Sequence, residues 1–276
     1  MLFLRNYAME RFLERLSASK YRNCFILKGG MLISAMVGID SRATMDIDTT
    51  LRNYPLNCES AEQIVRRIAD VEIDDKISFV IKKTEEIMED SEYQGVRLSL
   101  DAYLDKTRIP LKIDISTGDV ITPCEISFSY QLMFENRTIP LLAYPPETVL
   151  AEKLETILSR GEANTRLRDF YDVYILQRED FVVTPDALRY ALLATCRKRG
   201  HEDLLHTYAS ILNEVRQSGA MRAQWMKYQS DFDYAAGITW DTVLDTVETL
   251  CMKTLDDHAF GDELPQEESQ FEMHLL

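Results

Sequence analysis

The sequence has no run of about 18 consecutive apolar residues, the length that an α-helix needs to cross a bilayer. We therefore expect no membrane-spanning segment and no membrane partner. The first 16 residues also lack the uninterrupted apolar stretch and the small-residue cleavage site of a signal peptide, because charged residues interrupt them throughout. Their apolar spacing predicts an amphipathic helix instead.

Closely spaced cysteine pairs are also missing, which argues against a zinc site with the usual ligand spacing. The five cysteines are Cys24, Cys58, Cys124, Cys196 and Cys251. Cysteines scattered in this way are typical of reduced thiols in a cytoplasmic protein, so we expect that location. The sequence contains neither an internal repeat nor a low-complexity tract.

Positive charge is scarce: 31 lysines and arginines face 46 acidic residues, for a net charge of −15. An acidic chain is a poor general binder of nucleic acid. The excess is uneven, because residues 256–276 carry acidic residues and neither lysine nor arginine. We expect this segment to be a solvated, mobile tail, and a docking segment for a basic surface is the alternative. A local basic groove remains compatible with the cluster of Arg160, Arg166 and Arg168.

The pattern of apolar residues divides the chain into two parts. Strand-like and helical segments alternate up to the prolines at 145 and 146, and helical periodicity dominates beyond them. The predicted helices are residues 4–18, 31–37, 60–72, one that begins at 145–148, and then about 168–177, 185–198, 203–216, 220–228 and 240–255. The predicted strands are residues 24–27, 46–51, 78–84, 96–103, 109–115 and 138–143. We therefore predict an α+β fold: a mixed sheet with flanking helices in residues 1–144, a helical bundle in 145–255 and the acidic tail in 256–276.

Aspartates interrupt two of the predicted strands. Asp46 and Asp48 flank one isoleucine, so on a strand both side chains point to the same face and repel each other. A divalent cation such as Mg²⁺, which prefers oxygen ligands, would turn that repulsion into a binding site. Asp114 is a third acidic residue in an otherwise apolar strand, and it would join the other two if the strands were adjacent. The alternative is that these aspartates are simply solvated at a sheet edge.

A glycine pair, Gly29 and Gly30, stands between a predicted strand and a predicted helix. Glycines at such a place let backbone N–H groups approach a phosphate, and the start of a helix favours negative charge. An ordinary tight turn is the alternative. A glycine turn, a helix, two aspartates on the next strand and a third on a later strand form a more specific combination than any part alone.

Residues 28–51, KGGMLISAMVGIDSRATMDIDTTL, resemble the first motif of the nucleotidyltransferase fold of the DNA polymerase β superfamily. The likeness is closer to the AbiEii/AbiGii toxin family. The matching residues are Lys28-Gly29-Gly30, then Arg42, Thr44, Asp46 and Asp48, then Lys112 and Asp114, then Ala151-Glu152-Lys153, and finally Arg168-Asp169 with Asp172 and Tyr174. One departure is Met31, because the wider superfamily has a hydroxyl residue in the glycine turn.

This resemblance implies a metal-dependent nucleotidyltransferase that uses a nucleoside triphosphate. Mg²⁺ or Mn²⁺ would bind to Asp46, Asp48 and Asp114, and Lys153 would stabilise the transition state. Lys28, Gly29, Gly30, Arg42 and Thr44 would frame the nucleotide. Either Asp169 or Asp172 would orient Lys153 or take a proton from the acceptor hydroxyl, and the sequence does not decide between them.

The resemblance also implies a biological role, as the toxin of a type IV toxin–antitoxin or phage-defence system with a separately encoded antitoxin. It implies an RNA acceptor, above all the 3′ end of tRNA. Two alternatives stay open. The acceptor hydroxyl could belong to a small molecule or a protein, which the acidic composition favours slightly, or the chain could be a catalytically inactive binding module.

Overall fold

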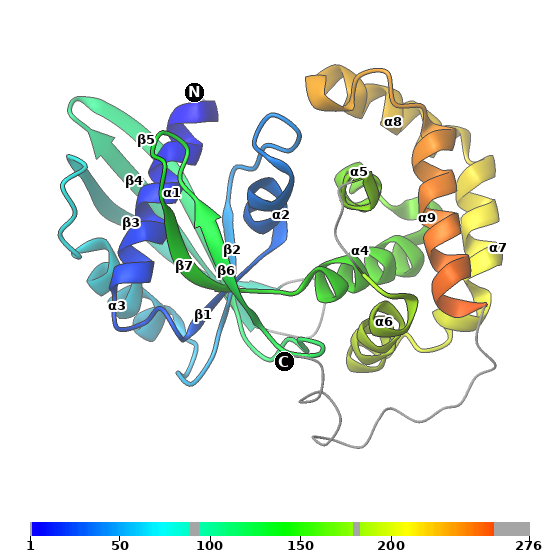
Figure 1. Cartoon of the computed structure of the whole chain (residues 1–276), viewed down its shortest axis with the longest axis horizontal. Helices are drawn as coiled ribbons and strands as arrows, with labels where there is room; N and C mark the ends of the chain where they lie inside the picture. Colours follow the sequence, from blue (N-terminus) through cyan, green and yellow to red (C-terminus); the bar gives the residue numbers. More distant parts are fainter. Residues whose placement is uncertain (1, 89–93, 179–182, 257–276) are drawn as a thin grey trace.

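The computed structural model describes residues 2–88, 94–178 and 183–256, which form a strand-rich part and a helical part side by side (Figure 1). The strands are β1 (Phe25–Lys28), β2 (Ile47–Leu51), β3 (Ile77–Met88), β4 (Gln94–Leu104), β5 (Thr107–Ser116), β6 (Ile126–Gln131) and β7 (Thr138–Ala143). The helices of this part are α1 (Leu2–Ala18), α2 (Gly29–Val37) and α3 (Cys58–Ala69).

All seven strands belong to one mixed sheet in the order β3-β4-β5-β2-β1-β7-β6. The pairs β2–β5 and β1–β7 are parallel, and the other neighbours are antiparallel. Strands β2 and β5 are far apart in the sequence, yet they are direct neighbours near the middle of the sheet. The α+β fold class is therefore confirmed, and so is the adjacency that the carboxylate argument required.

The two faces of the sheet differ in chemistry. Along β5, Leu111 and Ile113 are buried on one face, while Lys112 and Asp114 alternate with them and lie on the other. Helix α1 covers the apolar face, where its Phe12 ring packs edge-on against Phe79 of β3 at a centroid distance of 5.7 Å. The polar face therefore faces α2 and the helical part (Figure 1).

The helical part comprises α4 (Pro146–Arg160), α5 (Leu167–Arg178), α6 (Pro185–Arg199), α7 (Leu204–Gln217), α8 (Gly219–Asp231) and α9 (Trp240–Leu255). Helix α4 begins directly after β7, and Pro146 occupies its first turn, where a missing N–H costs nothing. Aromatic rings fill the core between α5, α8 and α9: the ring centroids of Phe170 and Trp240 are 5.0 Å apart, and those of Trp225 and Trp240 are 5.8 Å apart. In Figure 1, α5 lies toward α2 and the sheet, whereas α7 and α9 lie on the outer side.

Most predicted elements agree with the structure to within a few residues at their ends. The exceptions are β6, which was not predicted, and β3, which continues four residues beyond the predicted end at Thr84. The predicted boundary at 144/145 falls at the junction of β7 and α4, and the division into domains stays a prediction. The predicted tail lies outside the described residues apart from Asp256. Within the described ranges, no helix combines the length and the apolar character needed to cross a membrane.

Candidate active site

Three carboxylates gather on the polar face of the sheet. The parallel pairing of β2 and β5 sets Asp48 directly beside Asp114, and Asp46 lies in the bend that leads into β2. Burial raises the pKa of Asp46, and the charges of Asp48 and Asp114 raise it further. Burial and the charge of Asp114 likewise raise the pKa of Asp48. Asp48 and Asp114 are therefore neighbours on adjacent strands, and the repulsion among the three carboxylates is only partly relieved.

Arg97 of β4 holds the third member of this group. Its Nε and Nη2 atoms donate to the two carboxylate oxygens of Asp114, at 2.8 and 2.6 Å. Sequence reasoning missed Arg97, although a signal was there. A two-residue turn at Asp105 and Lys106 joins β4 to β5, and its register puts Arg97 directly opposite Asp114.

The three aspartates can be tested for their fit to a divalent cation. Their donor chemistry fits, because Mg²⁺ binds oxygen ligands and often uses only one or two carboxylates together with substrate phosphates. In the part of the chain that the structure describes, however, no group of three acidic, histidine or cysteine side chains is already arranged around a metal position. Asp46 and Asp48 therefore suit a two-carboxylate site, whereas both carboxylate oxygens of Asp114 already accept a hydrogen bond from Arg97.

The glycine turn, which forms the start of α2, is shaped by its contact with Asp48. Gly29 has a φ of +62°, and a Cβ atom there would lie 2.3 Å from Oδ2 of Asp48. The N–H group of Gly30 donates to the same oxygen at 3.3 Å. A Cβ atom on Gly30 would lie 2.7 Å from Oγ1 of Thr44. Both glycines are required for close approach, and the N–H of Gly30 orients a carboxylate of the site.

Lys28 lies in a buried ion pair rather than in an open phosphate site. Its Nζ atom donates to Asp119 at 2.9 Å, and both side chains are almost completely buried. Asp119 also accepts hydrogen bonds from Thr50, Ser116 and Tyr144. Burial alone would raise the pKa of Asp119, but Lys28 and these donors lower it to about 2. Asp119 was not foreseen, because it lies in a loop that carries no recognisable motif.

A second charged cluster joins the segment before β2 to helices α4 and α5. Nε of Arg42 donates to Asp172 at 2.6 Å, and Nζ of Lys153 lies 2.5 Å from Asp169 and 3.0 Å from Asp172. Burial would raise the pKa of Asp172, but Arg42 and Lys153 outweigh it and lower that pKa. Burial would lower the pKa of Lys153, and Asp169 and Asp172 raise it. Both aspartates that were predicted to orient Lys153 therefore contact it, and the proton-accepting role stays a prediction.

Arg42 and Thr44 were predicted to contact phosphates. In the structure each contacts and positions an aspartate of the site. The guanidinium of Arg42 is 3% exposed and is engaged by Asp172. Oγ1 of Thr44 donates to the backbone oxygen of Asp46 at 3.3 Å, which fixes the bend that carries this aspartate. The hydroxyl of Tyr171 in α5 adds a further link through a hydrogen bond to the backbone oxygen of Ser41.

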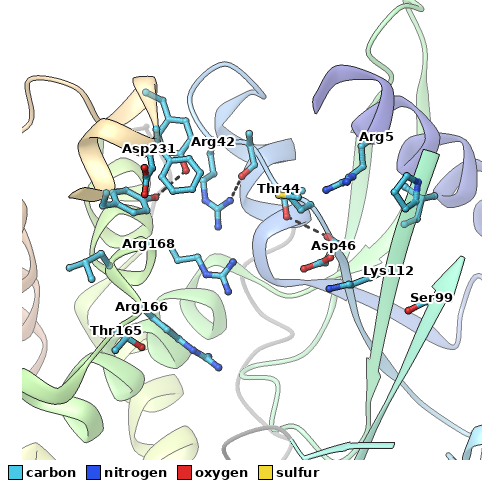
Figure 2. Close-up of a pocket in the computed structure, with 18 of the residues that line it drawn as sticks. Arg5, Arg42, Thr44, Asp46, Ser99, Lys112, Thr165, Arg166, Arg168 and Asp231 are labelled. Atoms are coloured by element: carbon cyan, nitrogen blue, oxygen red, sulfur yellow. Dashed lines mark hydrogen bonds between the residues drawn. The ribbon is translucent and has the colours of Figure 1, made fainter. Parts of the chain in front are cut away.

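A cavity of about 1090 Å³ separates the polar face of the sheet from helices α5 and α8. Its basic lining residues are Arg5, Arg42, Lys82, Arg108, Lys112, Arg166, Arg168 and Lys227, and its acidic ones are Asp46, Asp101 and Asp231. The cavity is thus locally basic in a chain of net charge −15. In Figure 2, Arg166 and Arg168 extend from the helical side toward Asp46 and Lys112 on the sheet side. Arg160, which was grouped with these arginines from the sequence, is not part of the lining.

Comparisons with known proteins give a family and a fold. A family model described as "Nucleotidyl transferase AbiEii toxin, Type IV TA system" matches residues 11–246. The chain is also similar to the crystal structure of a candidate nucleotidyltransferase from Helicobacter pylori, with a TM-score of 0.51, 14% identity, and coverage of 94% of this chain and 98% of that one. A second similar structure is JHP933 from the same organism, with a TM-score of 0.52, 14% identity, and coverage of 93% and 94%. No curated protein matches the chain.

Proposed function

The chain belongs to the AbiEii nucleotidyltransferase toxin family of type IV toxin–antitoxin systems, and from this premise we propose a specific reaction. The enzyme transfers a nucleoside monophosphate from a nucleoside triphosphate to an acceptor hydroxyl and releases pyrophosphate. The reaction depends on Mg²⁺ or Mn²⁺. The acceptor is RNA, with the 3′ end of tRNA as the first candidate.

One observation carries the proposal: Asp48 and Asp114 stand side by side on adjacent parallel strands, next to Asp46. Burial and mutual repulsion raise the pKa of Asp46 and Asp48, so their charged forms lack compensating positive charge on this face. Asp46 lines the cavity, and a carboxylate with a perturbed pKa in a cavity is typical of catalytic sites. The basic lining opposite them supports a triphosphate substrate and a polyanionic acceptor.

Each residue has a proposed task. Asp46 and Asp48 would hold the divalent cation, which when bound neutralises phosphate charge during in-line displacement. Asp114 accepts the proton of the acceptor hydroxyl at a carboxylate oxygen, and Arg97 orients this carboxylate through its two hydrogen bonds. Gly29 and Gly30 keep Asp48 oriented toward the nucleotide.

The helical cluster supplies the positive charge. Lys153 stabilises the negative charge that develops on the leaving pyrophosphate. Asp169 and Asp172 fix its ammonium group through contacts of 2.5 and 3.0 Å. Arg42 keeps Asp172 in place from the other side, so that the segment before β2 and Lys153 are linked through one ion-pair chain.

The acceptor class is the part of the proposal with a direct rival. The acidic net charge favours a small-molecule or protein hydroxyl, whereas the basic cavity favours RNA. We favour RNA because the lining, rather than the distant surface, determines what reaches Asp46. A cytoplasmic setting and a separately encoded antitoxin complete the proposal.

The test uses the purified full chain with each α-³²P-labelled nucleoside triphosphate and Mg²⁺. The acceptors are total RNA, purified tRNA, a protein extract and a small-molecule extract in separate reactions. Label on RNA is the expected result, and label on protein or small molecules alone would overturn the RNA part. Asp48→Ala is the matched inactive control. An absence of label from every fraction with both Mg²⁺ and Mn²⁺ would leave the binding module as the better account.

A further inference from the structure

One wall of the cavity is aromatic. Tyr228 and Phe232, at the end of α8, and Tyr234, in the short helical turn that follows, all line the cavity, and we call these three residues the aromatic wall. Phe232 is 39% exposed, although it packs against two other rings, whereas Tyr228 is 9% exposed. A phenyl ring exposed to that degree inside a cavity offers an apolar surface to a ligand.

Contacts between the rings hold the aromatic wall in place. The Phe232 ring lies 4.7 Å from Tyr228 and 5.4 Å from Tyr234, and its plane is within 28° of the plane of Tyr234. The hydroxyl groups of Tyr228 and Tyr234 are hydrogen-bonded at 3.0 Å. The Trp225 ring also stacks on Tyr228, at a centroid distance of 5.3 Å. The wall is therefore preorganised, and a planar ligand would bind without ordering it first.

The surroundings of the aromatic wall indicate the kind of planar ligand. Arg166 and Arg168 line the same cavity from the helical side, and Asp46 with Lys112 forms the opposite side (Figure 2). Cationic side chains suit phosphate groups, and an exposed aromatic face suits a base, because stacking contributes to binding for every base. An apolar face beside several arginines fits a nucleotide better than it fits a neutral apolar compound.

We propose that the aromatic wall, through the exposed ring of Phe232, is a stacking site for a nucleobase. This inference rests on the proposed function for the presence of a nucleotide at Asp46. Two sources can supply the base: the incoming nucleoside triphosphate and the terminal nucleotide of an RNA acceptor. The shared chemistry is a base stacked on Phe232 with its phosphates directed toward the arginines and the carboxylate group.

The test measures binding, by isothermal titration calorimetry on the full chain. One arm titrates each nucleoside triphosphate with Mg²⁺ and without acceptor, beside inorganic triphosphate with Mg²⁺. The other arm titrates a short RNA and the same RNA with an abasic 3′ terminus. The variants are Phe232→Ala, Phe232→Tyr, which keeps the ring, and Met226→Ala, a control on α8 that is 60% exposed and outside the lining.

We expect Phe232→Ala to weaken binding of the base-bearing ligand by roughly 5- to 150-fold, as the loss of one stacked base implies. Inorganic triphosphate should bind equally to all variants, and Phe232→Tyr and Met226→Ala should bind like the wild type. Weakening in the triphosphate arm assigns the wall to the incoming nucleotide. Weakening in the RNA arm, with no further loss for the abasic RNA, assigns it to the acceptor.

Two results would overturn the inference: unchanged affinity in both arms, or an equal loss for inorganic triphosphate, which would mean general disruption of the cavity. Thermal unfolding of each variant verifies that it is folded. Because these readouts require no transfer, they separate the two claims. A chain that stacks bases but transfers nothing keeps this inference and loses the proposed function, and an active chain indifferent to Phe232→Ala does the reverse.

Discussion

The two groups of aspartates in the cavity region have the same chemistry and opposite electrostatic situations. On the sheet, burial and mutual repulsion raise the pKa of Asp46 and Asp48, and no ion pair within the described residues involves either of them. On α5, Asp172 is fully buried, yet Arg42 and Lys153 lower its pKa. Burial alone therefore does not decide what a carboxylate does; its nearest cations do.

This difference separates binding from positioning. A carboxylate whose charge is already neutralised by the chain attracts a metal ion weakly. Carboxylates that repel each other bind a metal ion more favourably, because the ion relieves their repulsion. The α5 aspartates thus act on Lys153, whereas the sheet aspartates act, in the reaction that we propose, on a cation from solution. Asp114 stands between the two situations, because Arg97 neutralises it from a side chain that is 34% exposed.

The largest expected effect comes from removing one of the sheet carboxylates that has no ion-pair partner in the described chain. Asp48→Ala should lower the rate of nucleotide transfer by at least about 10³-fold, since it deletes a ligand of the proposed cation. Radiolabelled transfer under single-turnover conditions measures the rate, and Asp245→Ala on α9, a side chain 65% exposed, is the control. Transfer that survives Asp48→Ala would remove the sheet group from the mechanism.

Much of this comparison was accessible from the sequence. The alternation at Asp46, Ile47 and Asp48 placed the two carboxylates on one face, and Asp114 in an apolar strand marked the third. The adjacency of β2 and β5 could not be predicted from the apolar periodicity, because long-range packing determines the strand order of a mixed sheet. The family resemblance joined the separate motifs in their order.

The cationic partners were harder to foresee. Lys28 and Arg42 were expected at phosphates, which stays a prediction, and each forms an ion pair with a distant aspartate, Asp119 or Asp172. Pairs separated by 91 and 130 positions leave no trace in local patterns. Arg97 was within reach, because hairpin register alone puts it opposite Asp114. The strand β6 also had a signal, since its apolar and polar residues alternate.

A stability measurement sharpens the comparison, because removing the charge of an α5 aspartate and that of a sheet aspartate should change the free energy of unfolding in opposite directions. Asp172→Asn leaves Arg42 and Lys153 without their shared buried partner and should lower the free energy of unfolding by about 3–5 kcal/mol. Asp48→Asn removes repulsion and keeps an acceptor for the N–H of Gly30, so it should raise that free energy by about 0.5–2 kcal/mol. Urea unfolding at pH 7 measures both. Equal signs would mean that the two groups do not differ as described.

The pH dependence tests the same point from the α5 side. The pKa of Asp172 is lowered in the folded chain, so its contribution to stability is present above its unfolded pKa of about 4 and is lost as the pH falls through the lower folded value. Wild-type stability should therefore fall in acid more steeply than that of Asp172→Asn. Parallel curves for the two proteins between pH 5 and pH 2, taken by thermal unfolding, would contradict this.

The glycine turn tests whether Asp48 needs its exact placement. Gly29→Ala combines an unfavourable positive φ with a Cβ atom 2.3 Å from Oδ2 of Asp48, so we expect a loss of about 1–3 kcal/mol in stability and a fall in transfer rate of about 10²-fold. Gly38→Ala is the matched control, because Gly38 has a φ of +90° and a Cβ atom there would meet none of the described residues within 4 Å. Similar transfer rates for the two variants would show that backbone strain alone matters.

The smallest expected effect concerns Arg97, whose side chain is partly exposed, so that solvent screens its charge. Arg97→Met should remove the positive charge that neutralises Asp114 and thereby tighten Mn²⁺ binding by roughly 2- to 5-fold. This range corresponds to the free energy of one exposed ion pair. Titration calorimetry measures the affinity, and Arg108→Met, which breaks the neighbouring pair with Asp101, is the control. Weaker binding in Arg97→Met would mean that Arg97 keeps the Asp114 carboxylate in the place a metal ion needs. In that case Asp114 would resemble Asp172, because an arginine of the chain would determine how each carboxylate functions.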